Sequence, residues 1–346
     1  MIDWITLRAV HAQNQPLRGG YVASVTLDHD TGEERVEWVT DKRIPVAGSH
    51  DQRVTIKSAP QDPINEIEIS GNPAKFLQGH NVFGSDDLVG LAAAMYRGVL
   101  SRLGLVPTPA ELVYLDAGGF TLTRVDVTYS FDLQTLPRVL SAIRGLESSA
   151  HLRHRGRGQL TKGNTLYFGQ KSRRSSLKFY AKGQELRDHR LPDALLGSPL
   201  QDYADRLLRA ECTFRGMWLK DKGLHWGASW TPATPKELHR DMLENLSIAE
   251  AFMLDPDTIA GLPPRLQAVY QLWKDGHDLR AMYPARTFYR YRSELVKHGI
   301  DIAVKQPREE SNVVRLPVVL HAHQVVDIPA WAIGTPLYVE PRRAVG

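Results

Sequence analysis

The chain has 346 residues, of which 42% are hydrophobic, so it can fold around one large core or two ordinary ones. Its 43 Lys and Arg residues against 39 Asp and Glu give a net charge of +4, which by itself is weak evidence for a nucleic-acid partner. The single cysteine, Cys212, excludes a disulfide scaffold and a cysteine-rich zinc site. Because we find neither a signal sequence nor an apolar stretch of spanning length, we expect a cytoplasmic protein with no membrane contact.

The first part of the chain reads as strands interrupted by helices. Two strand-like stretches, residues 21–27 and 34–39, flank a turn-rich segment and predict a hairpin. Residues 120–131 alternate between polar and apolar side chains, which is typical of a strand with two different faces. Residues 87–103 and 136–146 carry apolar side chains at helical spacing and predict helices.

Three more strands are predicted further along. Residues 165–169 and 177–180 are strand-like and are joined by a polar turn, and residues 207–214 read as another strand. Strands with helices placed irregularly among them predict an α+β fold with a mainly antiparallel sheet flanked by helices.

The character of the sequence changes after about residue 232. Residues 235–253 and 266–274 predict helices, and residues 278–283 followed by a helix to residue 298 have the outline of a helix-turn-helix unit. We therefore expect a smaller helical domain after the sheet. The predicted division is a catalytic domain at residues 1–232, a helical DNA-binding domain at 233–315 and a C-terminal strand or tail at 316–346.

A basic run lies in the middle of the chain. Residues 151–182 contain nine Lys or Arg and no Asp or Glu. A solvated loop would explain such a run, but this one includes strand-like segments, which favours a surface that faces phosphates. The nine residues are Arg153, Arg155, Arg157, Lys162, Lys171, Arg173, Arg174, Lys178 and Lys182. Of these we single out Arg173, Arg174 and Lys178 for DNA binding.

The run ends at the most suggestive residue for chemistry, Tyr180. A tyrosine can attack a phosphodiester if its charge is stabilised and the phosphate is polarised. In a strand, Lys182 would share a face with Tyr180 and could stabilise the phenolate or the leaving oxygen, and Glu185 could hold a metal. The alternative is that Tyr180 is an ordinary packed residue at the end of a strand.

Phosphoryl transfer without a phosphate-binding loop usually needs a divalent cation, and no Walker-type glycine loop is present. The candidate ligands have oxygen or imidazole donors. They are His80, Asp126, Glu185 and Glu211. Asp126 could instead pair with Arg124, two residues before it and itself a candidate DNA contact, and His80 could be a surface residue in a polar turn.

A second candidate metal pair is His321 and His323. Two histidines at positions i and i+2 of a strand share a face, and the pattern resembles the histidine pair of rolling-circle nucleases and relaxases. The pair lies far beyond Tyr180 in a segment with little other polar chemistry, so we rank it second.

The predicted helix over residues 283–298 interleaves cations with aromatic side chains. Arg286, Arg290 and Arg292 could contact phosphates, while its aromatic residues stack or pack. An amphipathic helix that uses Phe288 for its core would have the same pattern, and both interpretations can hold on opposite faces.

These segments together resemble one family, the replication initiators of filamentous bacteriophages known as gene II and gene X proteins. The longest block spans residues 73–84, and residues 123–130 are similar to the family's Arg-x-Asp-x-Thr strand. The spacing Tyr180-x-Lys182-x-x-Glu185 matches the segment that holds the family's nucleophilic tyrosine. Further blocks in the same order extend the resemblance over roughly residues 60–315.

The resemblance implies a rolling-circle initiator nuclease. Tyr180 would nick the plus-strand origin of duplex phage DNA, form a 5′-phosphotyrosine, leave a 3′-OH primer and later religate the displaced strand. Lys182 would assist it, and His80, Asp126 and Glu185 would lie at the metal or phosphate site. The resemblance also implies Mg²⁺ (or Mn²⁺), duplex and single-stranded origin DNA, host replicative helicase and polymerase as partners, and the host cytoplasm as location.

The alternative from another functional class is a DNA-binding repressor or architectural protein without chemistry. Such a protein would use the basic run and the helical unit, and Tyr180 would only pack. A pure binder needs no coincidence of Tyr, Lys and Glu at the end of one strand.

Overall fold

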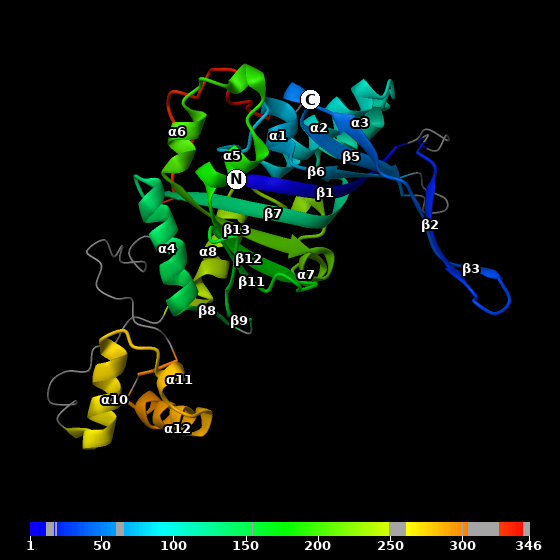
Figure 1. Ribbon diagram of the computed structural model, residues 1–346. Helices are drawn as coiled ribbons and strands as arrows, with labels where there is room; N and C mark the ends of the chain where they lie inside the picture. Colours follow the sequence, from blue (N-terminus) through cyan, green and yellow to red (C-terminus); the bar gives the residue numbers. More distant parts are fainter. Residues whose placement is uncertain are drawn as a thin grey trace.

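The main sheet of the computed structural model has nine strands, and every neighbouring pair is antiparallel (Figure 1). The structure describes residues 1–11, 17, 19–59, 66–153, 155–248, 261–298, 300–303 and 325–341. In spatial order the strands are β10 (Gln159–Thr161), β11 (Thr165–Phe168), β12 (Ser175–Ala181), β13 (Leu207–Arg215), β7 (Phe120–Asp132), β1 (Ile2–Val10), β6 (Glu66–Gly71), β5 (Arg53–Ser58) and β4 (Ile44–Ala47).

The centre of this sheet has one apolar and one polar face, because side chains alternate along each strand. On β12, Leu177 and Phe179 are wholly buried in the main hydrophobic core, whereas Lys178 and Tyr180 point to the other face. The apolar face packs against α4 (Leu136–Ser149) and α8 (Thr234–Glu244). The amphipathic helix α4 thus buries its apolar side on the sheet and leaves the polar face to other elements.

Helix α1 (Pro73–Gln78) shows how local sequence sets an element beside that polar face. Asn72 caps its first turn, since the side-chain oxygen accepts a 2.8 Å hydrogen bond from the Lys75 amide. Pro73 occupies the first helical position, and Gly79 ends the helix with a φ of 83°, which favours glycine.

The remaining helices around the sheet are α2 (Leu88–Arg102), α3 (Pro109–Asp116), α5 (Lys182–His189), α6 (Leu200–Asp205) and α7 (Gly216–Asp221), with 3₁₀ turns η1 (Ser49–Asp51), η2 (Asp193–Leu195) and η3 (Gly227–Ser229).

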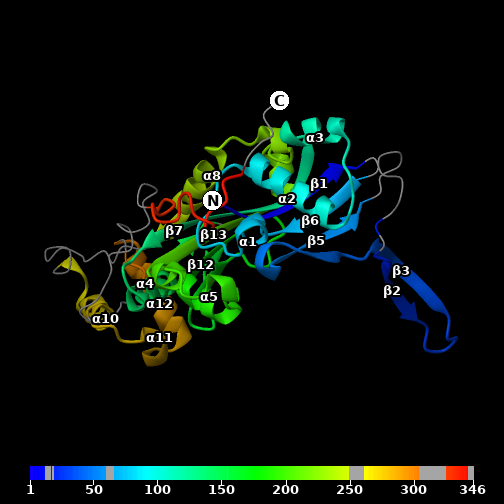
Figure 2. The ribbon, with the colours of Figure 1, turned by 90° about the horizontal axis from the view of Figure 1, so that it is seen from above.

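Two small sheets accompany the large one. Strands β2 (Tyr21–Leu27) and β3 (Glu34–Asp41) form a ribbon that projects from the body in both views (Figures 1 and 2). Strands β14 (Leu246–Ile248), β8 (Ala150–Leu152) and β9 (Gly156–Arg157) form the other.

A separate helical unit follows, at the end of the molecule away from that ribbon (Figure 2). It consists of α10 (Pro264–Lys274), α11 (Leu279–Met282) and α12 (Ala285–Val296). These helices enclose their own hydrophobic cluster, in which Tyr270, Trp273 and Phe288 are the largest members. The unit is therefore a second, smaller core.

The chain then returns to the first core through residues 325–341. Val325 forms a bridge with Phe131 on β7, and the Val326 amide donates a 2.9 Å hydrogen bond to the Ser130 carbonyl. Further along, Trp331 packs edge-on against Phe83, with 5.6 Å between ring centroids. This returning segment thus packs beside the sheet although it follows the helical unit in sequence, and its Ala332 belongs to a small cluster with Phe83 and Leu200 that is distinct from the main core.

The predicted fold class is confirmed: the protein is α+β, with a large antiparallel sheet flanked by helices and a smaller helical region after it. The predicted hairpin at residues 21–39 is confirmed as β2 and β3. The helix predicted over 235–253 is wrong at residues 246–248, which pair with β8 as a strand, and residues 249–253 lie outside the described residues. In the ranges that the structure covers, no helix is long and apolar enough to cross a membrane.

The division of the chain at residues 232 and 315 stays a prediction. Helix α8 lies beyond residue 232, yet it buries His239 against the sheet, where the ring packs 4.9 Å from that of Tyr129. The packing of the first core therefore continues past the predicted boundary.

Candidate active site

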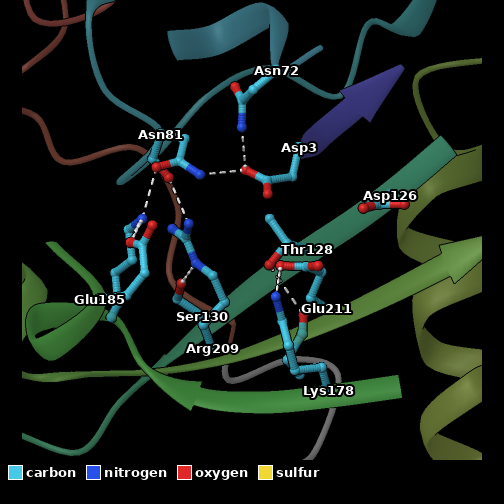
Figure 3. Close-up of polar contacts among 12 residues, drawn as sticks. Asp3, Asn72, Asn81, Asp126, Thr128, Ser130, Lys178, Glu185, Arg209 and Glu211 are labelled. Atoms are coloured by element: carbon cyan, nitrogen blue, oxygen red, sulfur yellow. Dashed lines mark hydrogen bonds and ion pairs between the residues drawn. The ribbon is translucent and has the colours of Figure 1, made fainter. Parts of the chain in front are cut away.

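A cavity of about 440 Å³ opens on the polar face of the sheet, where β12, β13, β7 and β1 lie side by side. Each of these strands contributes charged or phenolic side chains to its wall (Figure 3). The residues lining it are Asp3, Trp4, Asn72, Lys75, Asn81, Arg124, Asp126, Thr161, Lys162, Asn164, Thr165, Tyr167, Lys178, Tyr180, Ala181, Glu185, Asp188, His189 and Glu211.

Tyr180 lies in this cavity near the end of β12, with only 5% of its surface exposed. It lies directly opposite Arg209 on β13, whose guanidinium interacts electrostatically with the phenol. Burial, together with the charge of Glu211, raises the pKa of Tyr180 well above its usual value, while the Arg209 guanidinium opposes this rise. A phenolate at Tyr180 therefore depends on nearby positive charge.

Arg209 is held in one orientation by neutral acceptors. Its Nε donates to Ser130 Oγ at 3.1 Å, Nη1 donates to the Asn81 carbonyl at 2.5 Å, and Nη2 donates to the Val82 carbonyl. The side chain is 1% exposed and forms no carboxylate ion pair within the described ranges. Its positive charge thus lies opposite Tyr180, and no acid among the described residues forms an ion pair with it.

Lys178 supplies a second cation beside Tyr180. Its Nζ lies 4.4 Å from the centroid of the Tyr180 ring and 2.9 Å from Glu211 Oε2. Although burial opposes the charge, Glu211 keeps the pKa of Lys178 above its ordinary value, so the ammonium stays protonated. We predicted Lys178 as a DNA contact, and the structure places it against the candidate nucleophile.

Three carboxylates line the cavity together with Tyr180: Asp3, Asp126 and Glu211 (Figure 3). Burial raises the pKa of both Asp126 and Glu211, and the charge of Asp3 raises each of them further. Arg124 and Lys178 partly offset this repulsion, with Arg124 Nε donating to Asp126 Oδ1 at 2.9 Å. The cavity thus concentrates negative charge that is only partly compensated.

Asp3 was not predicted from sequence. Between Ile2, which pairs with Val127, and Trp4, which pairs with Asp126, it is the extra residue of a β-bulge. Its Oδ1 accepts hydrogen bonds from Asn72 Nδ2 at 3.0 Å and from Asn81 Nδ2 at 2.7 Å (Figure 3). A strand at residues 2–10 was not predicted either, so no local signal pointed to Asp3.

Lys182 does not share a strand face with Tyr180, as we had predicted. Strand β12 ends at Ala181 and Lys182 begins α5, so the alternation stops between the two. Its Nζ donates to Asn81 Oδ1 at 2.7 Å and pairs with Glu185. Burial lowers the pKa of Lys182 to about 7. Lys182 therefore holds the loop after α1 and does not line the cavity.

Glu185 lines the cavity, but its carboxylate already forms ion pairs with two lysines. It pairs with Lys182 and, at 3.4 Å, with Lys75 on α1. Burial works against its charge, yet these two lysines hold the pKa of Glu185 well below its usual range. Its carboxylate thus joins α5 to α1.

Of the four predicted metal ligands, Asp126, Glu185 and Glu211 line the cavity, whereas His80 lies elsewhere. His80 is buried, stacks edge-on against Phe83 and forms a 2.7 Å hydrogen bond with the Leu337 carbonyl, and burial lowers its pKa to about 4. It is not among the residues that line the cavity. Across the described chain, no three His, Cys, Asp or Glu side chains are arranged to hold a metal ion. His321 and His323 lie outside the described residues.

The predicted DNA contacts fall in three places. Arg124 lines the cavity but is bonded to Asp126, as the alternative interpretation had it, while Arg173 and Arg174 are exposed in the turn between β11 and β12. On α12, Arg286 and Arg290 are exposed. Arg292 makes two 2.7 Å contacts to Asp301. Arg286 and Arg290 are therefore free to meet a ligand, whereas Arg292 is held by its acid.

Comparison with known proteins gives the family. The family model for the N-terminal part of the phage gene II replication-associated protein matches residues 1–233, and the model for the C-terminal part of the same protein matches residues 256–338. The replication-associated protein of Enterobacteria phage I2-2 is 35% identical over 332 residues, which cover 93% of this chain and 94% of that one. The corresponding protein of Enterobacteria phage M13 is 31% identical over 183 residues, or 46% and 42% of the two chains.

Similarity to solved structures is weaker. A rolling circle replication initiator protein from Geobacillus stearothermophilus aligns with 74% of this chain and 89% of its own, at 12% identity and a TM-score of 0.31. A likeness this low carries no conclusion for the present chain.

The class to which the chain belongs is therefore that of the phage replication-associated proteins. Within that class, it is a member of the gene II protein family, because the N-terminal family model alone matches about two thirds of it and the I2-2 relative aligns over nearly its whole length. The resemblance to filamentous phage initiators is thereby confirmed.

Proposed function

We propose that this protein is a rolling-circle replication initiator that nicks one strand of phage origin DNA with Tyr180. The observation that carries the proposal is the placement of Tyr180 in a polar cavity, directly opposite Arg209 and with Lys178 over its ring. Burial raises the pKa of Tyr180, and Arg209 opposes this rise, so the guanidinium favours the charged phenolate that an attack on phosphorus requires. Membership of a family of replication-associated proteins supports the same conclusion.

The proposed step is a transesterification. The Tyr180 Oη forms a bond to phosphorus, the bond from phosphorus to O3′ breaks, and O3′ takes up a proton to become a 3′-OH. The DNA 5′ end stays on Tyr180 as a phosphotyrosine, and the reverse reaction with a new 3′-OH religates the strand. Arg209 would stabilise the phenolate before attack and after departure.

We propose Mg²⁺ (or Mn²⁺) as cofactor, with Asp3, Asp126 and Glu211 as ligands after a rearrangement of the cavity, because the described side chains are not arranged to hold an ion as they stand. The donor set fits a hard cation, since all three offer carboxylate oxygens and their mutual repulsion would be relieved by positive charge. The ion would polarise the scissile phosphate. Metal binding would require the ion pairs Lys178–Glu211 and Arg124–Asp126 to break, so that both carboxylates could turn to the metal ion. His80 and Glu185 would not be ligands, because their partners lie elsewhere.

The helical unit would recognise the duplex origin. Arg286 and Arg290 lie on the exposed side of α12 together with Tyr289, which is 54% exposed. This basic and aromatic surface suits phosphate contact and stacking. Host polymerase would extend the 3′-OH and a host helicase would open the duplex, in the host cytoplasm.

The nick is tested on a supercoiled plasmid that carries the origin, with Mg²⁺ present. Wild type should relax it and leave a covalent adduct at the 5′ end, whereas Tyr180→Phe should bind but form none. An adduct in Tyr180→Phe would overturn the role of Tyr180. Wild type that binds the origin and never nicks it, with Mg²⁺ or Mn²⁺, would instead support a non-catalytic repressor or architectural protein.

The helical unit is tested with the double variant Arg286→Ala, Arg290→Ala. It should lose most duplex-origin binding while still cleaving a single-stranded origin oligonucleotide, because the cavity is intact. Arg292→Ala is the matched control, since that residue is already paired with Asp301. Equal loss of both activities in the double variant would contradict a separate duplex reader.

A further inference from the structure

The lysines and arginines that line the cavity differ in one respect. Lys75 pairs with Glu185, Arg124 with Asp126 and Lys178 with Glu211. The fourth, Lys162, is exposed and has no carboxylate within ion-pair distance among the residues described. Among the lysines and arginines of the cavity wall, Lys162 is thus the one that no described acid neutralises.

Lys162 also has an unfavourable backbone conformation. It lies with Gly163 at the centre of the turn between β10 and β11, where the Asn164 amide donates to the Thr161 carbonyl at 3.4 Å. Both central residues have positive φ, 52° for Lys162 and 71° for Gly163, as in a type I′ turn. Asn-Gly is the preferred pair in such a turn, and a lysine at the first position is disfavoured. The turn itself gives no reason for a lysine.

The turn is fixed close to the candidate nucleophile. The Ala181 amide, next in the chain after Tyr180, donates to the Asn164 carbonyl at 3.3 Å, and Thr165 on β11 pairs directly with Tyr180. The tip that carries Lys162 is therefore held over the end of β12, so that its ammonium can reach a ligand bound at Tyr180.

The charges of the cavity determine which contacts a DNA ligand requires there. Asp3, Asp126 and Glu211 repel a phosphodiester, and the other lining lysines and arginine are engaged by acids. Until a metal ion neutralises those carboxylates, an entering DNA strand needs a cation that no acid engages to offset the repulsion. Backbone strain retained at one residue with no structural benefit is typical of a functional position.

We propose that Lys162 binds a backbone phosphate of the single DNA strand beside the scissile bond and so positions that strand over Tyr180. The inference rests on the proposed nicking function and adds the residue that guides the strand. Lys162 is a positioning residue in this reaction, since the bond that breaks lies at Tyr180.

The experiment measures binding without cleavage, in a Tyr180→Phe background, with a single-stranded origin oligonucleotide over a range of salt. Adding Lys162→Asn should weaken binding about tenfold, as expected for one lost charge-assisted contact. The slope of log affinity against log salt should fall by about 0.7. Lys162→Arg should bind like the parent. Lys222→Asn, an exposed turn lysine outside the cavity, is the matched control and should change neither quantity.

Thermal unfolding provides the second readout. Because asparagine suits positive φ better than lysine, Lys162→Asn should melt at the same temperature as the parent or higher, although it binds DNA less well. Unchanged affinity and salt slope in Lys162→Asn would overturn the proposal, as would a parent that does not bind the oligonucleotide at low salt. Failure of the nicking function would appear separately, as absence of an adduct with wild type on the same oligonucleotide.

Discussion

The two faces of strand β12 differ completely in what they contact, although their residues alternate one by one. Leu177 and Phe179 pack in the main core, and Phe179 lies edge-on to Phe168 with 6.3 Å between ring centroids. Lys178 and Tyr180 lie between them in sequence and line the polar cavity. The same seven residues thus serve the core on one side and the candidate chemistry on the other.

This difference separates stability from activity within one strand. The apolar face stabilises the fold through burial, which needs no particular partner chemistry. The polar face gathers buried charges whose desolvation is only partly repaid by their pairing. We therefore expect substitutions on the first face to unfold the protein, and conservative substitutions on the second to leave a folded but inactive one.

The largest expected effect is on the free energy of unfolding, and it distinguishes two neighbouring residues on opposite faces of β12. Phe179→Ala removes a wholly buried ring and should lower the free energy of unfolding by about 3–5 kcal/mol. Tyr180→Phe keeps the ring and should change it by no more than about 1 kcal/mol, the worth of a typical hydrogen bond. Denaturant unfolding of both variants measures this, and similar losses for the two would break the comparison.

Variants of Arg209 test whether the polar face of the sheet affects the reactivity of Tyr180 and does not only pack against it. Arg209→Gln should slow adduct formation by about 10²–10³-fold, the usual loss when one charge-stabilising donor is removed. Because the guanidinium opposes the rise in the pKa of Tyr180, its removal raises that pKa further and shifts the pH–rate profile to higher pH. Arg209→Lys should restore part of the rate. A slower variant with an unshifted profile would mean that Arg209 only holds the loop at Asn81.

The smallest effect concerns a titratable group on the apolar face. His239 on α8 is 2% exposed, and its Nε2 contacts the Ala210 carbonyl at 3.1 Å. Burial lowers the pKa of His239 from 6.5 to about 3, so the unfolded chain takes up the proton first. Its contribution to stability is full above pH 6.5 and declines as the pH falls towards 3.

By this linkage, acidification from pH 7 to pH 5 should cost about 2 kcal/mol through His239 alone. Glutamine cannot take up the proton but can still donate to the Ala210 carbonyl, so His239→Gln should lose that much less stability over the same range. Denaturant unfolding at both pH values measures the difference. An unchanged acid response would show that His239 is already charged in the folded protein.

Alternation along the strands made much of the sheet predictable. The patterns at residues 120–131, 177–180 and 207–214 correspond to β7, β12 and β13, and they correctly assigned Tyr180 and Asp126 to strands. Alternation is a local property of the chain, so it is readable without knowing what the strand will pair with.

The errors in the site come from contacts between distant parts of the sequence. His80 is taken out of solvent by Leu337, 257 residues away, and no pattern around residue 80 contains that contact. Lys182 was misplaced because a face shared with Tyr180 requires the strand to continue through residue 182, whereas the strand ends at Ala181 and α5 begins at Lys182. Asp3 enters the cavity through a bulge that depends on the pairing of β1 with β7. Only Asn72, followed by proline at a helix start, left a signal that could have been used.

The return of residues 325–341 to the sheet has a practical consequence. The helical unit is joined to the sheet-containing part at both of its ends, so a stop codon placed after α12 would also delete the partners of Phe83 and His80. A minimal catalytic fragment should therefore be made by excising the helical unit and splicing residue 248 to residue 325 through a short linker. In the intact chain, attachment at both ends would keep the proposed duplex reader near the cavity, which would raise the effective concentration of DNA bound by one part at the other.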